Sequence, residues 1–202
     1  PVREDRWKAV IAPHDDFKYA GEVTMEALAG IKAKTVILFG VAHKARNFGL
    51  EDKLIFGSHY HWEAAYGKIP VSPLRNEIIA KLDEKHWMIQ DDMQEIEHSL
   101  EAITPFLQSQ NRFIEIIPIL APAMNFKKME NISSALSKVL AQIFEEKGWA
   151  LGKEVALVIS NDAIHYGDEE WGGKNLAPMG SGEKGNAKAL AFEQEIIQTC
   201  LA

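Results

Sequence analysis

The sequence predicts an α/β protein with a mostly parallel sheet and helices on both of its faces. Short, uninterrupted apolar runs rich in β-branched residues are typical of strands that are buried on both faces of a sheet. Segments with helical periodicity lie between these runs, and strands that alternate with helices form right-handed βαβ units. Of the 202 residues, 47% are hydrophobic and 25% are charged, which is the balance of a globular domain.

Four strands and five helices are predicted along the chain. The strands cover the apolar runs at residues 9–11, 35–39, 114–120 and 155–159. Helical periodicity marks the segments 21–31, 73–85, 93–107, 131–147 and 186–199. Gly148 predicts the end of the fourth helix. Pro105, inside the third, predicts either a kink or the real start of that helix.

Two segments lack this regularity. Glycine and proline interrupt residues 41–72, where we expect a hairpin or a long loop. Residues 167–185 are rich in glycine and polar residues and predict a loop. They contain a match to GxGxxG at 180–185, but this match follows no predicted strand, so we expect no bound nucleotide.

Composition restricts the class of function. The length fits a single domain over residues 1–202. A net charge of −7 and the lack of a basic stripe argue against nucleic acid or a membrane as a partner. The longest apolar run, 36–42, is far too short to span a bilayer. Cys200 is the only cysteine, which excludes a disulfide within the chain, and we see no signal peptide; we therefore expect a cytoplasmic protein.

Polar clusters follow three of the four predicted strands. The first strand is followed by His14, Asp15 and Asp16, the second by His43, and the fourth by the segment 160–167. Ligands of open α/β sheets bind outside the carboxyl ends of the strands. We therefore expect the three clusters to face one crevice.

His14 and His43 are candidate metal ligands at these strand ends. Neutral imidazole suits iron, zinc and copper, and most such sites need a third donor. Asp162 or His165 could supply it and leave open coordination positions. The alternative is that each histidine caps a helix or forms hydrogen bonds within a loop.

A third histidine lies on a polar helix face. Gln94, Glu97, His98 and Glu101 share one side of the predicted helix 93–107. This face could point into the crevice and place His98 there as an acid/base group, or it could be solvated.

A further pair of histidines, His59 and His61, alternates along one face of a predicted strand. They are either a second metal-binding pair or an exposed strand edge.

Six segments in this order resemble the motifs of the Memo family, whose members are relatives of the class III extradiol dioxygenases and include protein B of the AmmeMemoRadiSam system. These segments are 13–21, 40–43, 62–71, 97–101, 116–120 and 160–167. The resemblance implies the class III extradiol dioxygenase fold, in which the enzymes use non-haem Fe(II). It also implies that His14 and His43 are metal-side ligands, that His98 is the acid/base or pocket histidine, and that Tyr19 and Trp62 line the pocket.

The sequence departs from the family at the third metal-side residue. The family has a cysteine there, and this chain has Ile164, which cannot bind a metal. Either Asp16, Glu97, Asp162 or His165 replaces it, or the metal has been lost; Asp16 and Glu97 are also expected to line the pocket. Family members continue past the end of this chain, so we expect a smaller sheet or the loss of their C-terminal helix and strand.

Three classes of function remain. The first is a metal-dependent oxidoreductase of dioxygenase type with one metal ion, Fe(II) before copper or zinc. The second is a non-catalytic module with a degenerate metal site that binds a small molecule or peptide. The third is a metal-dependent hydrolase in which Asp15, Asp16 and Asp162 bind Mg²⁺ or Mn²⁺. The sequence leaves room for a homodimer.

Overall fold

The computed structural model describes residues 6–162, 164–167, 170–171, 174–175 and 179–201. The chain divides into two compact units, one that ends at Asn161 and one that begins at Asp162. Each unit is described by itself.

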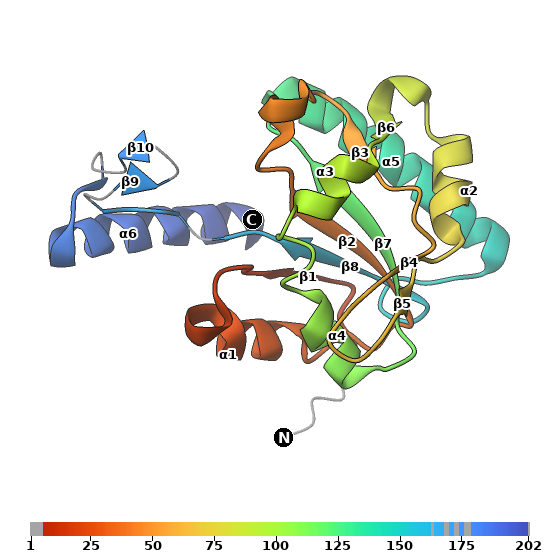
Figure 1. Cartoon of the computed structure of the whole chain (residues 1–202), viewed down its shortest axis with the longest axis horizontal. Coiled ribbons are helices and arrows are strands. Elements are labelled where there is room, and N and C mark those ends of the chain that lie inside the picture. The colour runs from red at the N-terminus through yellow and green to blue at the C-terminus, as the bar shows by residue number, and fades with distance from the viewer. Residues whose placement is uncertain (1–5, 163, 168–169, 172–173, 176–178, 202) are drawn as a thin grey trace. The chain divides into compact units, whose positions relative to one another are not determined.

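A six-stranded sheet forms the centre of the first unit (Figure 1). Its strands, in spatial order, are β1 (Ala9–Ala12), β8 (Val155–Ser160), β2 (Thr35–Val41), β7 (Glu115–Ala121), β3 (Leu54–Phe56) and β6 (Trp87–Ile89). All neighbouring strands pair in parallel except β3 and β7, which are antiparallel. The predicted α/β class with a mostly parallel sheet is confirmed.

The most apolar runs of the sequence form the middle of this sheet. Val36, Ile37 and Leu38 of β2 have no exposed surface, and the same holds for Ile116 and Ile117 of β7. These strands are covered on both sides, which is why their sequences are continuously apolar rather than alternating. At the edge strand β1, by contrast, Ile11 is 57% exposed.

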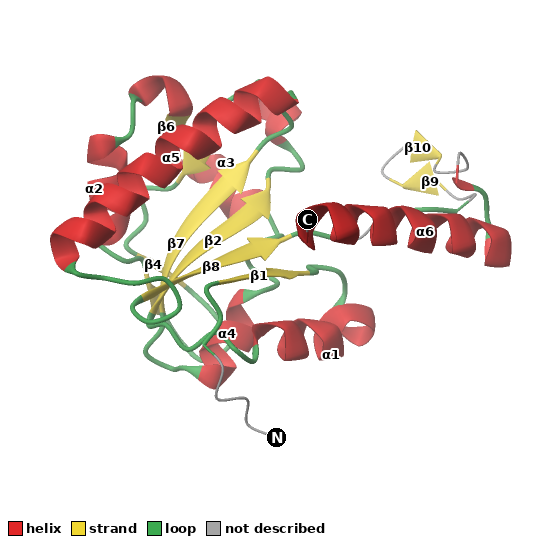
Figure 2. Cartoon of the chain, turned by 180° about the vertical axis from the view of Figure 1, so that it is seen from behind, coloured by secondary structure: helices red, strands yellow, loops and turns green. Residues whose placement is uncertain are grey.

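Helices cover both faces of the sheet (Figure 2). Side chains from α1 (Phe17–Leu28) and α4 (Thr104–Gln110) pack with one set of strand residues, which includes Val36, Leu38 and Val158. Side chains from α2 (Leu74–Lys81) and α5 (Phe126–Lys147) pack with the opposite set, which includes Ile37 and Ile117. Because neighbouring residues of a strand point to opposite faces, the alternation of Val36, Ile37 and Leu38 between the two sets places one helix pair on each face.

The prediction of one helix over 93–107 is wrong. In its place α3 (Asp91–Ile96) ends before a non-helical segment, and α4 begins at Thr104 with Pro105 in its first turn. Pro105 therefore marks a true helix start. The helix stops at Ile96 because the Glu97 carboxylate accepts hydrogen bonds from the backbone amides of His98 and Ser99, which competes with the helical pattern.

The irregular segment 41–72 contains a hairpin, one of the two structures expected there. It is formed by β4 (His61–Trp62) and β5 (Ile69–Pro70), which pair antiparallel. A short 3₁₀ helix, η1 (Ala45–Phe48), and β3 precede it, and a second, η2 (Glu84–His86), precedes β6. β3 and β6 have three residues each, too few to give a periodic pattern in the sequence.

The second unit contains β9 (Glu170–Trp171), β10 (Lys174–Asn175) and α6 (Gly182–Leu201). The first two pair antiparallel within the segment that was predicted to be a loop. None of the helices in the described ranges is long and apolar enough to cross a membrane.

Candidate metal centre

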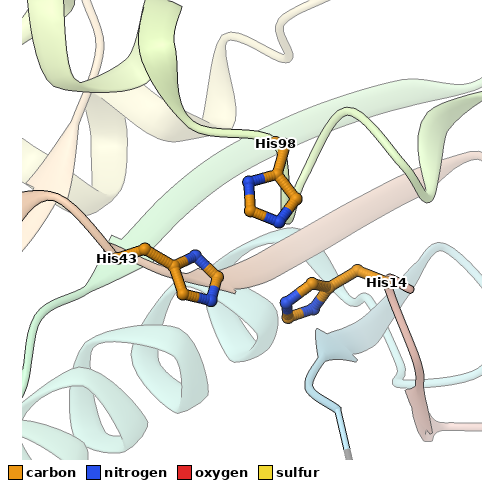
Figure 3. Close-up of side chains that lie close together, drawn as sticks. All are labelled: His14, His43 and His98. Atoms are coloured by element: carbon orange, nitrogen blue, oxygen red, sulfur yellow. The ribbon is translucent and has the colours of Figure 1, made fainter. Parts of the chain in front are cut away.

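Three histidines from separate parts of the first unit converge on one point. His14 follows β1, His43 follows β2, and His98 lies in the segment between α3 and α4. β1 and β2 are both parallel to β8, so their carboxyl ends lie at the same edge of the sheet, as the sequence predicted. Figure 3 shows the three imidazole rings turned toward one another.

The three rings are close enough to bind one metal ion. One nitrogen from each of His14, His43 and His98 lies within 4.8 Å of the other two. The rings of His43 and His98 are stacked with centroids 4.9 Å apart, and the ring of His14 meets both edge-on at 5.3 and 5.5 Å. His14 is 4% exposed, whereas the other two are accessible from solvent. The set thus combines one buried candidate ligand with two that are exposed to solvent.

Glu97 fixes His43 in place. One carboxylate oxygen, Oε1, accepts a hydrogen bond from His43 Nδ1 at 2.9 Å, and Oε2 accepts one from the His43 backbone amide at 2.8 Å. Oε1 also lies 3.4 Å from Nδ1 of His98. Although Glu97 is only 3% exposed, it therefore lies in a shell of donors rather than in an apolar environment.

These hydrogen bonds set the charge of Glu97 and the tautomer of His43. Burial raises the pKa of the Glu97 carboxyl, but the hydrogen bonds from His43 and from the amides of Ser99 and His43 outweigh it, so the pKa is lowered overall. The carboxylate is thus ionised at neutral pH and requires a proton on Nδ1 of His43. The lone pair on Nε2 of a neutral His43 is then available for a metal ion, as in carboxylate–histidine–metal arrangements.

Ser160 sets the tautomer of His14. Its hydroxyl, at the end of β8, donates a hydrogen bond to the backbone oxygen of Ser99 at 2.5 Å and lies 2.9 Å from Nδ1 of His14. A hydroxyl has one proton, so with that proton given to Ser99 it accepts from Nδ1–H of His14. His14 is therefore held in the Nδ1–H tautomer, in which the ring lone pair is on Nε2.

Ser99 anchors the His98 segment to the end of β2. Its hydroxyl donates to the backbone oxygen of Val41 at 3.0 Å and accepts from the Val41 amide at 3.1 Å. Gly40 makes this approach possible, since a Cβ atom there would lie 2.5 Å from the Ser99 hydroxyl oxygen and 2.6 Å from Cδ2 of Leu100. The position of His98 thus depends on a residue without a side chain in the neighbouring strand.

Two open cavities adjoin the centre. The larger, of about 580 Å³, is lined by residues that follow β1, by the β4–β5 hairpin and by the start of α4, namely His14, Asp15, Asp16, Phe17, Glu63, Ala64, Ala65, His98, Glu101, Ala102, Thr104 and Pro105. The smaller, of about 370 Å³, is lined by His59, His61, Trp62, Glu63, Gln94, Glu95, Glu97 and Glu101. The larger cavity has the size of a small-molecule site and contains two of the three histidines.

The residues that the sequence singled out for the pocket lie in different places. Asp16 lines the larger cavity, and Trp62 and Glu97 line the smaller one. Tyr19 lies on α1, is 70% exposed and lines neither. His59 lies 3.5 Å from Glu95 and 3.8 Å from Asp91, but among the described residues only His14, His43 and His98 group as candidate metal ligands.

Asp162 and His165, the other candidate ligands, belong to the second unit. There His165 Nε2 lies 3.7 Å from a carboxylate oxygen of Asp162. In the same unit the backbone amide of Ile164 donates a hydrogen bond to the Glu193 carboxylate. That Asp162 or His165 binds a metal ion remains a prediction.

Reasoning from sequence did not find the roles of Ser99 and Ser160. The only signals for them were their places, next to His98 in one case and at the end of a strand in the other. A hydroxyl that fixes a histidine tautomer leaves no pattern of its own in a single sequence, because its partner is 146 residues away.

Comparisons with known proteins identify a family for this chain. A family model described as Memo-like protein matches residues 1–193. A MEMO1 family protein of Thermotoga maritima is 28% identical over 165 residues, which are 79% of this chain and 54% of the relative. A MEMO1 family protein of Aquifex aeolicus is 26% identical over 197 residues, which are 96% of this chain and 67% of the relative. The chain thus spans about half to two thirds of the length of these relatives.

Proposed function

The chain belongs to the Memo-like family, and from that premise we propose that it is a metal-dependent oxidoreductase of dioxygenase type. One metal ion is bound by His14, His43 and His98; Fe(II) is the first choice, and copper or zinc the next. The observation that carries the proposal is the convergence of three imidazoles, each with one nitrogen within 4.8 Å of the other two, while Nδ1 of His43 and of His14 is engaged by Glu97 and Ser160.

The donor set fits such an ion. Neutral imidazole nitrogen is a common ligand of iron, copper and zinc, and three protein ligands leave coordination positions open for small molecules. When bound, the ion would supply the redox or Lewis-acid chemistry that none of these side chains has by itself. Ile164 cannot take part as the family's cysteine does, and His98 is the residue that we propose as third ligand in its place.

The protein's own residues have three tasks in this proposal. Glu97 and Ser160 hold His43 and His14 in the tautomers that a metal needs. The larger cavity binds the substrate beside the histidines and excludes part of the solvent around it. If another group completes the metal site, the accessible His98 is placed to move a proton at the cavity wall.

A second candidate function rests on Ile164. Without a thiolate ligand, the same pocket would be a non-catalytic module that recognises a small molecule or peptide. Binding in that case survives complete removal of metal.

Elemental analysis of the purified protein tests the metal proposal. We expect about one equivalent of iron, copper or zinc per chain, lost in the His14→Ala, His43→Ala double variant because both fixed imidazoles are removed. His61→Ala is the matched control, since it removes an exposed histidine outside the candidate centre and should keep the metal. Metal that persists in the double variant would place it elsewhere, and wild-type protein that neither contains nor is stabilised by metal would rule out the centre.

If metal is present, oxygen consumption by the loaded protein with aromatic and amine substrates tests the dioxygenase chemistry. Turnover of esters, amides or phosphates without oxygen uptake would instead favour hydrolysis by an activated water.

A further inference from the structure

The larger cavity beside the histidines is lined by carboxyl groups. Asp15 and Asp16 extend from the end of β1, Glu63 from the hairpin, and Glu101 from the segment before α4. Glu63 and Glu101 line both cavities. As far as the described residues go, neither lining contains a lysine or an arginine. The site that a substrate enters is therefore negatively charged at neutral pH.

These carboxylates are not neutralised by neighbouring cations. Lys68 lies 3.4 Å from Glu63, but both side chains are largely exposed, and such a pair is weak. In the described part of the chain no ion pair joins Asp15, Asp16 or Glu101 to a lysine, an arginine or a histidine. A divalent ion on the three histidines would offset two of the four negative charges and leave the cavity negative.

Apart from His14, His98 and Thr104, the rest of the lining is apolar. Phe17, at the start of α1, is 56% exposed and packs edge-on against Phe106 at 5.2 Å. Ala64, Ala65, Ala102 and Pro105 complete the wall with short side chains. Such a wall leaves room for an aromatic or aliphatic body and offers it contact without hydrogen bonds.

We propose that this cavity binds a small organic cation, a primary amine whose ammonium group lies among Asp16, Glu101 and Glu63 and whose apolar body lies against Phe17 and Pro105. The inference deepens the proposed function and rests on it in one respect, namely that the substrate occupies the cavity beside the three histidines. It names the charge class of that substrate. An anionic ligand would meet the same carboxylates at close range and be repelled.

Three probes of nearly equal shape test the charge class. Phenethylamine is the cation, phenylacetate the anion and phenylacetamide the neutral control. Binding is measured by ligand-observed NMR titration of the purified protein, before and after treatment with a chelator. We expect phenethylamine to bind at least about tenfold more tightly than phenylacetate, because the two differ mainly in charge, and its affinity to fall with added salt as for an exposed ionic contact.

Neutral variants locate the effect. Glu101→Gln and Asp16→Asn keep shape and remove charge, and each should weaken phenethylamine by about fivefold while phenylacetamide is unchanged. Glu145→Gln, an exposed acid on α5, is the matched control and should have no effect. Phenylacetate that binds as tightly as phenethylamine, no measurable phenethylamine binding, or an amine affinity unaffected by both pocket variants would overturn the inference.

The two proposals fail in different ways. A protein that neither contains nor is stabilised by metal but still prefers the amine upholds the cation site and rules out the metal centre. A protein that loses its metal in the His14→Ala, His43→Ala variant but shows no preference for the amine keeps the metal centre and rules out the cation site. Metal content and amine affinity are measured on the same samples, so each result bears on one proposal.

Discussion

At the scale of single residues, Glu97 has more contacts in the candidate centre than its place in the sequence indicates. One buried carboxylate accepts hydrogen bonds from the ring and amide of His43 and from the amides of His98 and Ser99. It therefore ends a helix, orients one candidate ligand, His43, and adjoins another, His98. A polar residue on a predicted helix face could be expected to line a pocket, but the breaking of the helix by that same residue could not be expected.

Glu97→Gln separates this orienting role from charge in general. In one orientation its amide nitrogen would face the backbone amide of His43, and in the other it would face the amides of His98 and Ser99. Either way two donors would be in contact, so the side chain could not hold His43 as the carboxylate does. We expect metal affinity to fall by about 10- to 100-fold, as for other residues that orient metal ligands, when it is measured by competition with a chromogenic chelator. Glu145→Gln should leave it unchanged. Equal affinity in wild type and Glu97→Gln would mean that His43 needs no orientation or binds no metal.

At the scale of elements, the strands that form the centre of the sheet could be read from the sequence and the segments that complete the site could not. The runs at 35–39 and 114–120 are apolar enough to identify β2 and β7 without any tertiary information. The segment 97–103 has helical periodicity but is not helical, because its residues form other hydrogen bonds, including the long-range ones between the Ser99 hydroxyl and the backbone of β2. A local sequence pattern cannot reveal a hydrogen-bond partner 58 residues away.

Gly40 tests whether this contact positions the site. In Gly40→Ala the new methyl group would meet Ser99 and Leu100, both of which are fully buried, so the turn that carries His98 must move. We expect the free energy of unfolding to fall by about 1–3 kcal/mol, as for other overpacked sites, and metal affinity to fall with it.

Gly21→Ala is the companion variant for that experiment. It lies in α1, where a Cβ would have only ordinary contacts at 3.7 Å, and alanine should raise stability by roughly 0.5–1 kcal/mol. Urea denaturation and chelator competition on both variants provide the measurement. A Gly40→Ala protein with wild-type stability and metal affinity would show that the His98 segment is held by other contacts.

At the scale of the whole molecule, the layered α/β arrangement follows from the pattern of the sequence, whereas the mixed character of the sheet does not. The antiparallel pairing of β3 with β7 reverses the direction of the sheet beyond β7, and it involves a strand of three residues. The candidate site lies on the other side of that point, where β1, β8 and β2 are all parallel. This is why two of the three histidines could be placed at a common edge from the strand assignments and the third could not.

Because the three histidines come from distant parts of the chain, a bound ion should stabilise the folded protein as a whole. The unfolded chain has no preformed site, so a ligand at about 100 times its dissociation constant adds about 2.7 kcal/mol to the free energy of unfolding. We expect the melting temperature to rise on addition of Fe(II) under anaerobic conditions or of Zn²⁺, and to return with a chelator. The rise should be lost in the His14→Ala, His43→Ala variant and kept in His61→Ala, whose histidine lies outside the group. An equal rise in the double variant would mean that the stabilising ion binds elsewhere, so the three histidines would then be a hydrogen-bonded cluster held by Glu97 and Ser160 without a metal.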